Sequence, residues 1–332
     1  MSHAITNTNG KNEIAYAGET PWHGLGQKLE AGADLQTWLV AAGMDWKIKR
    51  SKVRYAVDAD SAQQMVFNEW PQQHVLFRSD TKAPLGMVSD HYKPVQPRQV
   101  LEFMGSLCKY NGFTMETAGT LKGGSVYWAL AQVGEQDTLV GGDKIRGYAL
   151  LSTSADGTRR TEAKFTTVRV VCNNTLNMPD RDTGQAVVCI SHRSHFDAAT
   201  VKTDLGLVHS SFEQFMDSAR QLADRKLNQK EATDFVLGLL NGEDYKKYNE
   251  AQRQDALSNK HAKAIQVLYY GAGKGSALDS SRNTAWGLVN AVTEYVDHHY
   301  PARSDENRLQ SAWFGANERL KNSALRQALA LV

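Results

Sequence analysis

Basic and aromatic side chains are concentrated around residue 50. The segment KIKRSKVR spans residues 47–54 and holds five cations in eight positions. Its alternating pattern predicts a strand or hairpin, on which several cations can line one groove and contact phosphates. Flanking aromatic rings can stack on unpaired bases. The candidate phosphate contacts are Lys47, Lys49, Arg50, Lys52 and Arg54, and the candidate stacking residues are Trp46, Tyr55 and Trp22.

The same run has a plainer interpretation. Lysines and arginines on the solvated face of an edge strand keep that strand from pairing with other chains. Basic clusters also occur on ordinary surfaces that bind no nucleic acid. Both interpretations are open at the level of sequence.

A second group of cations lies about a hundred residues further on. Arg159 and Arg160 follow an Asp-Gly turn signal, so we expect them at the tip of a hairpin. With Lys164 they would form a second wall of the nucleic-acid groove. The other cations of this stretch are Lys144 and Arg146.

The segment RVVCNNTL, residues 169–176, brings an arginine and three polar residues to the end of a predicted strand. Arg169 lies among apolar residues and needs a partner, for which an internal ion pair is favoured over an anionic ligand. Asn173, Asn174 and Thr175 suit a helix or turn cap. Alternatively, they offer amide and hydroxyl groups to a backbone or base.

Two cysteines and two histidines raise the question of a nucleophile or a metal site. Cys172, Cys189, His192 and His195 follow the pattern C-x16-C-x2-H-x2-H. Zinc sites usually pair their ligands as C-x2–4-C and H-x3–5-H, which this pattern does not match. No His–Asn/Asp arrangement near Cys172 supports nucleophilic catalysis. We therefore expect no catalytic residue, no metal and no other cofactor.

A glycine-rich segment in the second half resembles a phosphate-binding loop. YYGAGKGS departs from GxxxxGK[ST], because Gly275 follows Lys274 and the first glycine is wrongly spaced. The residues before it also follow a helical pattern, whereas a phosphate loop follows a strand. We interpret it as an interhelical loop and expect no nucleotide hydrolysis.

The segment 284–299, TAWGLVNAVTEYVDHH, has the clearest helical period. Asn290, Glu294 and His298 recur at every fourth position on one face, with Asp297 beside them. A carboxylate and a histidine so placed could ligate a metal or form an acid–base pair. A solvated face, or a contact with the front of the chain, is the favoured interpretation.

Composition limits the class of protein. The 332 residues are 41% hydrophobic and 22% charged with a net charge of +2, so any affinity for nucleic acid requires a local basic patch. Three scattered cysteines suit a reducing compartment. The amino terminus lacks the apolar core of a secretory signal, and no run of 18 apolar residues exists. We expect a cytoplasmic protein without a membrane span.

The order of the elements predicts an α+β fold. Residues 1–20 are expected to form a loose N-terminal arm, residues 21–200 an α+β domain, and residues 201–332 a helical region. The domain would hold a mostly antiparallel, curved β-sheet with a crossing helix that starts near Pro97, preceded by a short helix from its N-cap Asp34 to Gly43. Glycine pairs at 123–124 and 141–142 separate its strands. The predicted helices of the rear are Leu205–Lys226, Gln229–Leu240, Gln252–Tyr270, Arg282–Tyr300 and Asn307–Leu331.

Five ordered blocks of the sequence resemble one family. They are TPWHGLG (20–26), LGMVSDHYKPVQ (85–96), AGTLKGG (118–124), TTVRVVCNNTL (166–176) and TAWGLVNAVTEYVDHH (284–299). Over roughly residues 21–331 the chain resembles the phage/plasmid-like domain-of-unknown-function family 932. The resemblance implies a home on phages, prophages or plasmids and assigns no reaction.

A second resemblance concerns the predicted architecture alone. A curved antiparallel sheet with a crossing helix and basic strands is similar to the core of single-strand annealing recombination proteins. With the basic segments, it predicts an oligomeric protein that binds or anneals single-stranded DNA, or assists recombination, without nucleotide hydrolysis. The alternative is a protein–protein interaction factor, such as a host-enzyme inhibitor or an antirestriction-like protein. A metal-dependent enzyme that uses Glu294, Asp297 and His298 ranks third.

Overall fold

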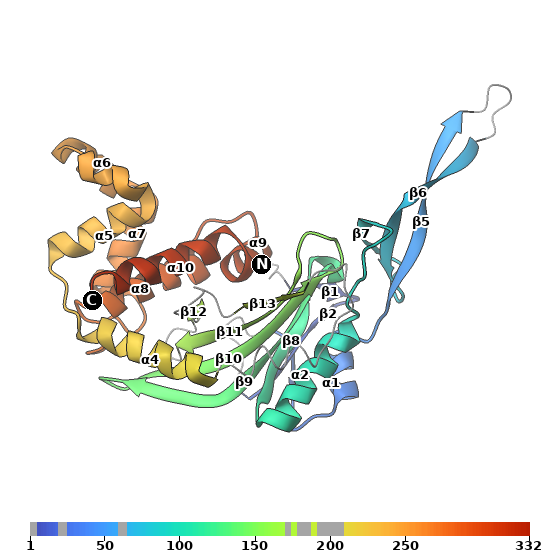
Figure 1. Ribbon diagram of the computed structural model, residues 1–332, viewed down its shortest axis with the longest axis horizontal. Coiled ribbons are helices and arrows are strands. Elements are labelled where there is room, and N and C mark those ends of the chain that lie inside the picture. The colour runs from blue at the N-terminus through green and yellow to red at the C-terminus, as the bar shows by residue number, and fades with distance from the viewer. Residues whose placement is uncertain (1–4, 19–24, 59–64, 170–173, 178–186, 191–208) are drawn as a thin grey trace.

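The computed structural model describes residues 5–18, 25–58, 65–169, 174–177, 187–190 and 209–332. A twisted sheet occupies the middle of the molecule, helices lie at one end, and a long hairpin projects from the other (Figure 1). Strands dominate the first half and helices the second. The predicted α+β fold, with its helical C-terminal region, is confirmed.

The main sheet is antiparallel except at one edge. Its order is β12-β11-β10-β9-β8-β3-β4, β13 pairs with β11, and among the described strands only β3 and β4 run parallel. Glycines with positive φ form the turns at 123–124 and 141–142, as the sequence predicts. The strands are Ile14–Ala17 (β3), Gln27–Leu29 (β4), Thr114–Leu121 (β8), Val126–Leu139 (β9), Asp143–Ser154 (β10), Thr161–Arg169 (β11), Asn174–Asn177 (β12) and Val187–Ile190 (β13).

The amino-terminal residues belong to the sheet. After the short strands β1 (Asn7–Thr8) and β2 (Lys11–Asn12), every residue of β3 is buried between β8 and β4. Ile5 and Ile14 join a hydrophobic cluster with Trp128. The predicted loose arm is therefore wrong for residues 5–18, because these few apolar side chains suffice to anchor a polar segment.

Two helices cross one face of the sheet (Figure 1). Helix α1 (Leu35–Ala41) begins at its predicted cap, where the Asp34 carboxylate accepts the Thr37 amide at 2.7 Å. Helix α2 (Pro97–Asn111) begins at the predicted proline. Its side chains Val100, Leu101 and Met104 are buried in the larger core cluster.

The rear helices form one hydrophobic cluster with the sheet. Phe212 and Trp286 belong to this cluster together with β-strand residues such as Leu151.

Two of the predicted rear helices are each divided in two. The predicted helix 252–270 is interrupted at Asn259, which caps a new helix, and the predicted helix 307–331 is interrupted at Gly315. The predicted domain boundary between residues 200 and 201 lies outside the described residues. The helices are His209–Asp224 (α4), Gln229–Asn241 (α5), Glu250–Ser258 (α6), Lys260–Val267 (α7), Ala285–Glu294 (α8), Asp305–Phe314 (α9) and Ala316–Leu329 (α10), with π-helical turns Leu268–Ala272 and Tyr295–His299.

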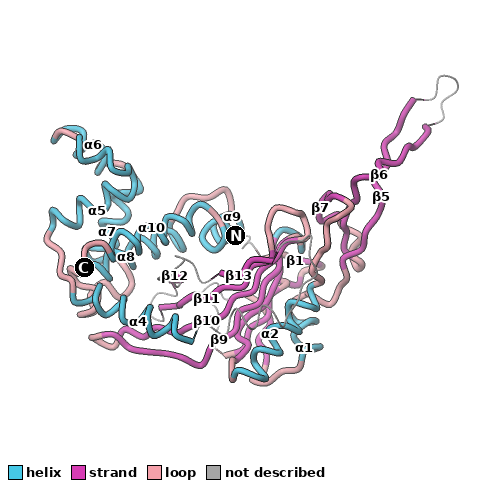
Figure 2. The backbone as a smooth tube through the Cα atoms, viewed as in Figure 1, coloured by secondary structure: helices cyan, strands magenta, loops and turns pink. Residues whose placement is uncertain are grey.

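A separate three-stranded sheet carries the basic run. Strands β5 (Ile48–Asp58) and β6 (Met65–Arg78) form the long antiparallel hairpin, and β7 (Pro84–Ser89) pairs with β6 only from Gln73 to Phe77. Beyond β7, two strands alone extend away from the body (Figure 2). We call β5 and β6 together the projecting hairpin.

Candidate nucleic-acid interface

The projecting hairpin presents the cations of the basic run to solvent. Lys47 and Lys49 are exposed, and neither forms an ion pair with any described residue. Arg50 is held at the base of the hairpin, where its guanidinium donates to the carbonyl oxygens of Asp90, at 3.1 Å, and Tyr92. Two lysines are thus available to a ligand, whereas Arg50 also has a structural role.

Glu69 on β6 holds the next two cations. Its carboxylate accepts from Lys52 at 2.7 Å and from Arg54 at 3.0 Å. These hydrogen bonds, from Lys52 first and Arg54 second, lower the pKa of Glu69. All three side chains are solvent-exposed to a large extent, so a phosphate would compete with Glu69 for both cations.

The opposite side of the hairpin is aromatic. Residues directly opposite each other in antiparallel strands share a face, and Val53 pairs with Trp70 while Tyr55 pairs with Asn68. Tyr55 and Trp70 are therefore diagonal neighbours on one face, at 49% and 48% exposure. We call this side, formed by Val53, Tyr55, Val57, Val66, Asn68 and Trp70, the aromatic face.

Trp46 cannot serve as the predicted stacking residue. It is only 3% exposed, and its indole nitrogen donates to the Gly43 carbonyl at 2.7 Å. The Arg78 guanidinium lies 4.4 Å from its ring centroid, and the Tyr127 ring meets it edge-on. Strand β5 begins only at Ile48, so Trp46 lies in the bend before it, and its ring is turned into the core. Trp22 lies outside the described residues.

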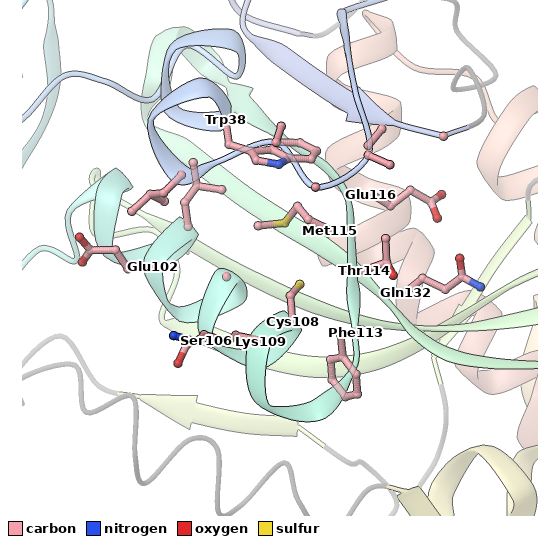
Figure 3. A pocket seen from close by; sticks show the side chains of 18 of the residues that line it. Trp38, Glu102, Ser106, Cys108, Lys109, Phe113, Thr114, Met115, Glu116 and Gln132 are labelled. Atoms are coloured by element: carbon pink, nitrogen blue, oxygen red, sulfur yellow. The ribbon is translucent and has the colours of Figure 1, made fainter.

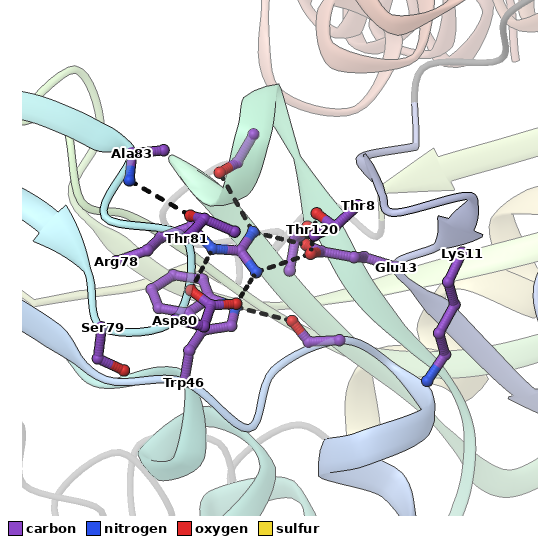
Figure 4. Close-up of polar contacts among 12 residues, drawn as sticks. Thr8, Lys11, Glu13, Trp46, Arg78, Ser79, Asp80, Thr81, Ala83 and Thr120 are labelled. Atoms are coloured by element: carbon purple, nitrogen blue, oxygen red, sulfur yellow. Dashed lines mark hydrogen bonds and ion pairs between the residues drawn. The ribbon is translucent and has the colours of Figure 1, made fainter.

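A buried ionic cluster joins the hairpin to the main sheet (Figure 4). The Arg78 guanidinium contacts the Glu13 carboxylate at 2.7 and 2.9 Å and that of Asp80 at 2.7 and 3.0 Å. Thr8 and Thr120 donate to the same Glu13 carboxylate. Burial opposes the charge on Arg78, but the hydrogen bonds to Asp80 and Glu13 raise its pKa. The cluster thus fixes where the hairpin leaves the body.

The second basic group is divided between core and surface. Lys164 is 2% exposed and donates to Glu318 at 2.5 Å and to the Trp313 carbonyl at 3.0 Å. It is not part of any groove wall, because helices from the end of the chain cover its face of β11. Burial lowers the pKa of the half-buried Arg159, whereas Arg160 is exposed beside Glu162. The side chain of Arg169 is not among those described.

The turn that carries Arg159 and Arg160 packs on the base of the projecting hairpin. A Cβ placed on Gly86 of β7 would lie 2.5 Å from the Asp156 Cα, so the backbones are in direct contact. The Tyr92 hydroxyl donates to the Ser154 carbonyl at 2.7 Å, and burial and the nearby Asp156 raise the pKa of Tyr92. The structure therefore packs the Asp156 end of this turn against β7, leaves Arg160 exposed beside Glu162 and keeps Lys164 apart in the core.

Glu294 and Asp297, which the sequence offered as residues of a metal-dependent enzyme, form structural contacts within the chain. Glu294 is buried and accepts the backbone amide of Lys274 at 2.9 Å, so a carboxylate of the chain itself is bound at the glycine-rich loop. Asp297 pairs with Lys321 at 2.7 Å, and the Asn290 amide donates to the Trp286 carbonyl. The described residues contain no group of three His, Cys, Asp or Glu side chains placed to hold a metal.

The cysteine–histidine pattern is only partly described. Cys172, His192 and His195 lie outside the described residues. Cys189 is an exposed free thiol on β13, whose pKa is raised by partial burial.

A cavity lies beside α1, α2 and the start of β8 (Figure 3). Its volume of about 1090 Å³ is that of a small-molecule site. Trp38, Phe113 and Met115 supply apolar surface, while Glu116 and Gln132 add polar groups. Glu116 is already hydrogen-bonded by the Tyr148 hydroxyl at 3.1 Å. None of these residues was a candidate from the sequence, since they come from elements far apart in the chain.

Sequence reasoning also missed the β6 side of the interface. Glu69 and Trp70 lie within MVFNEW, whose valine, phenylalanine and tryptophan are typical of a strand. Pro71 directly after it indicates a break, yet the strand continues through a register shift opposite Lys52 and Val53. The β-prone residues before the proline were the signal that could have found both residues.

The comparisons with known proteins identify the family. Among the described residues, no helix is both long and apolar enough to cross a membrane. No curated protein and no solved structure matches the chain. A family model described as "Domain of unknown function (DUF932)" matches residues 84–313, so the match starts at the first residue of β7 and the projecting hairpin precedes it. Because that match covers well over half of the 332 residues, the chain belongs to the DUF932 family.

Proposed function

We propose that this chain binds single-stranded DNA along the projecting hairpin, without nucleotide hydrolysis. The observation that carries the proposal is the pairing of two half-exposed rings, Tyr55 and Trp70, on a narrow ribbon whose edge strand is basic. Stacking on aromatic side chains is tolerant of sequence, because every base has a flat π face. We therefore expect little sequence preference.

The cations would follow the DNA backbone. Lys49 lies on the same face as Tyr55, and Lys52 and Arg54 lie on the other side of a ribbon only two strands wide. Long lysine and arginine side chains can reach around such an edge to phosphates. Arg160, exposed on the connection between β10 and β11, would extend the basic track. Annealing requires that the repulsion between the two DNA backbones is cancelled while the bases remain accessible.

The finer assignments rest on resemblance. The sequence blocks of the family suggest a phage or plasmid origin, and the architecture suggests a recombination-accessory role in the cytoplasm. We propose both on that basis, together with the absence of a catalytic role.

Fluorescence anisotropy tests the proposal with fluorescent oligo-dT and a duplex of equal length. We expect tighter binding of oligo-dT, and weaker binding after Lys47→Ala with Lys49→Ala. Two lost phosphate contacts should lower the slope of log affinity against log salt by about 1.4. Lys260 and Lys263 on α7 are also exposed and without a described ion pair, so their double alanine variant is the matched control. Equal and negligible binding of both oligonucleotides at low salt would refute the proposal.

A protein–protein interaction factor is the second candidate, and a specific observation favours it. Phe67 and Met87 are 60% and 57% exposed on the same three-stranded sheet, and Val66 is 46% exposed. Exposed apolar patches commonly mark protein contacts. Binding of a protein partner would be far less sensitive to salt than DNA binding, so a titration at two salt concentrations separates the two functions.

A further inference from the structure

The outer edge of β6 is unpaired where the projecting hairpin leaves the body. Strand β7 pairs with β6 from Gln73 to Phe77, and the Gln72 carbonyl accepts the Asp90 amide. From Met65 to Trp70, no described strand pairs with this side of β6. Such an edge offers a row of backbone N–H and C=O groups to another strand.

The two edges of the hairpin differ in charge. The β5 edge carries Lys49, Arg50, Lys52 and Arg54, and antiparallel pairing of two such edges about Val53 would set Lys52 opposite Arg54. Like charges directly opposite each other are destabilising, so β5 is protected against self-pairing. The β6 edge, MVFNEW, is apolar and β-prone and carries Glu69 as its single charge.

We propose that the free β6 edge pairs with the same edge of a second copy of this chain. Antiparallel pairing about Asn68 sets Asn68 opposite Asn68, and Val66 of each copy opposite Trp70 of the other. Amide–amide hydrogen bonds and a contact between an aromatic and a β-branched side chain are favourable cross-strand pairs. Pro71, which has no backbone N–H, ends the pairing on each side.

The charges are compatible with this arrangement. Glu69 of each copy faces Phe67 of the other, and the two glutamates are diagonal neighbours. Each glutamate is already held by Lys52 and Arg54 of its own chain, at 2.7 and 3.0 Å. These ion pairs offset the repulsion that two unpaired carboxylates would cause. No cation is brought opposite a cation, in contrast to pairing through β5.

Pairing also resolves an instability of the isolated hairpin. A two-stranded hairpin without a covering layer is marginally stable in water, whereas more strands with a shared apolar face stabilise one another. The product is a four-stranded sheet in which the aromatic faces of both copies are continuous. Both basic β5 strands stay on the outside. The inference does not rest on DNA binding, but it leaves the proposed DNA surface open and doubles it.

The mass of the protein in solution, measured by light scattering without DNA, tests the inference. At tens of micromolar, we expect twice the chain mass of 36.8 kDa. Val66→Lys with Asn68→Lys places charges on the β6 edge and should reduce the mass to that of one chain. Ser51→Lys with Ala56→Lys is the matched control on the β5 edge and should leave the dimer intact. Circular dichroism checks that both variants keep the fold.

A cross-linking experiment keeps the inference falsifiable if the lysine variant does not fold. Under mild oxidation, Asn68→Cys should form a disulfide-linked dimer whose bridge peptide mapping assigns to position 68. Ala56→Cys, on the β5 edge, should remain unlinked there. A monomeric mass for the unmodified chain, a dimer that persists in Val66→Lys with Asn68→Lys, or equal linking of both cysteine variants would overturn the inference. Because no DNA is present, its failure is distinct from failure of the proposed function.

Discussion

Arg78 of β6 and Glu13, which directly precedes β3, form a buried, two-point ion pair between residues 65 positions apart. Nη1 and Nη2 of the arginine contact the two carboxylate oxygens at 2.9 and 2.7 Å, and the side chains are 2% and 4% exposed. Trp46 covers the guanidinium from one side. One contact thus joins the projecting hairpin, the amino-terminal strand and the core.

Removing one partner of this pair should be costly. Glu13→Ala leaves the Arg78 charge buried with one carboxylate fewer, and breaking a buried pair in this way costs about 3–5 kcal/mol. Urea unfolding measures the difference in free energy. Glu102→Ala breaks the exposed pair of Glu102 with Arg98, which should cost about 0.5 kcal/mol or less. Similar losses for the two variants would show that the buried pair does not anchor the hairpin.

Asp80 should make the free energy of unfolding depend on pH in the acid range. Burial acts to raise its pKa, but hydrogen bonds from Arg78 and from the Thr81 amide outweigh it, so the pKa lies below the ordinary 3.8. A lowered carboxyl pKa stabilises the folded chain above the ordinary value and loses that effect as the pH falls through the lowered value. The difference in stability between the unmodified chain and Asp80→Asn should therefore be full above the ordinary value of 3.8 and narrow as the pH falls below it. A gap that widens with acid would contradict the assignment.

Replacing Lys164 should lower the stability of the fold and leave DNA binding unchanged. Lys164→Ala removes the cation that contacts Glu318 in a part-buried site, and we expect a loss of about 3 kcal/mol or more in urea unfolding. The salt dependence of oligo-dT binding should stay unchanged at temperatures where the variant is folded. A lower salt slope for this variant would show that the buried position seen here opens in the complex.

The sequence predicted elements well where local patterns decide them. Asp34 and Pro97 mark helix starts by their own backbone chemistry, and both predictions are confirmed. Burial of a strand face depends on what packs against it. Lys164 lies opposite Leu150 on a face that Trp313 covers from 149 residues further along, and no local pattern carries that information. Trp46 was misjudged for the same reason, since its cover includes Arg78 and Tyr127.

Two glycines should respond oppositely to alanine. A Cβ on Gly86 would meet the Asp156 backbone at 2.5 Å, so Gly86→Ala must move β7 away from the β10–β11 turn, at a cost of about 1–3 kcal/mol. Gly105 lies inside α2 with no atom within 4 Å of a built Cβ. Gly105→Ala should stabilise the chain by about 0.5–1 kcal/mol. Thermal unfolding of both variants is the measurement, and a stabilised Gly86→Ala would refute the close packing at the hairpin base.

Glu69 should restrain DNA binding through the cations that it holds. Its carboxylate bonds Lys52 and Arg54, and both bonds must be exchanged when these side chains contact phosphates. Glu69→Gln removes the negative charge and keeps the size, so both cations become free for the backbone of single-stranded DNA. We expect tighter oligo-dT binding at low salt. The dependence on salt should also be steeper by up to about 1.4 in the log–log slope if two further contacts form.

The matched control for this variant is Glu162→Gln, which releases the exposed Arg160 on the connection between β10 and β11. It removes one carboxylate and one pairing, so its effect on the slope should be at most half as large. Circular dichroism should be unchanged for both, because exposed ion pairs contribute little to stability. Weaker binding by Glu69→Gln would mean that the carboxylate positions Lys52 and Arg54 for the ligand. Unchanged binding with an unchanged slope would show that these two cations protect the β5 edge and contact no phosphate.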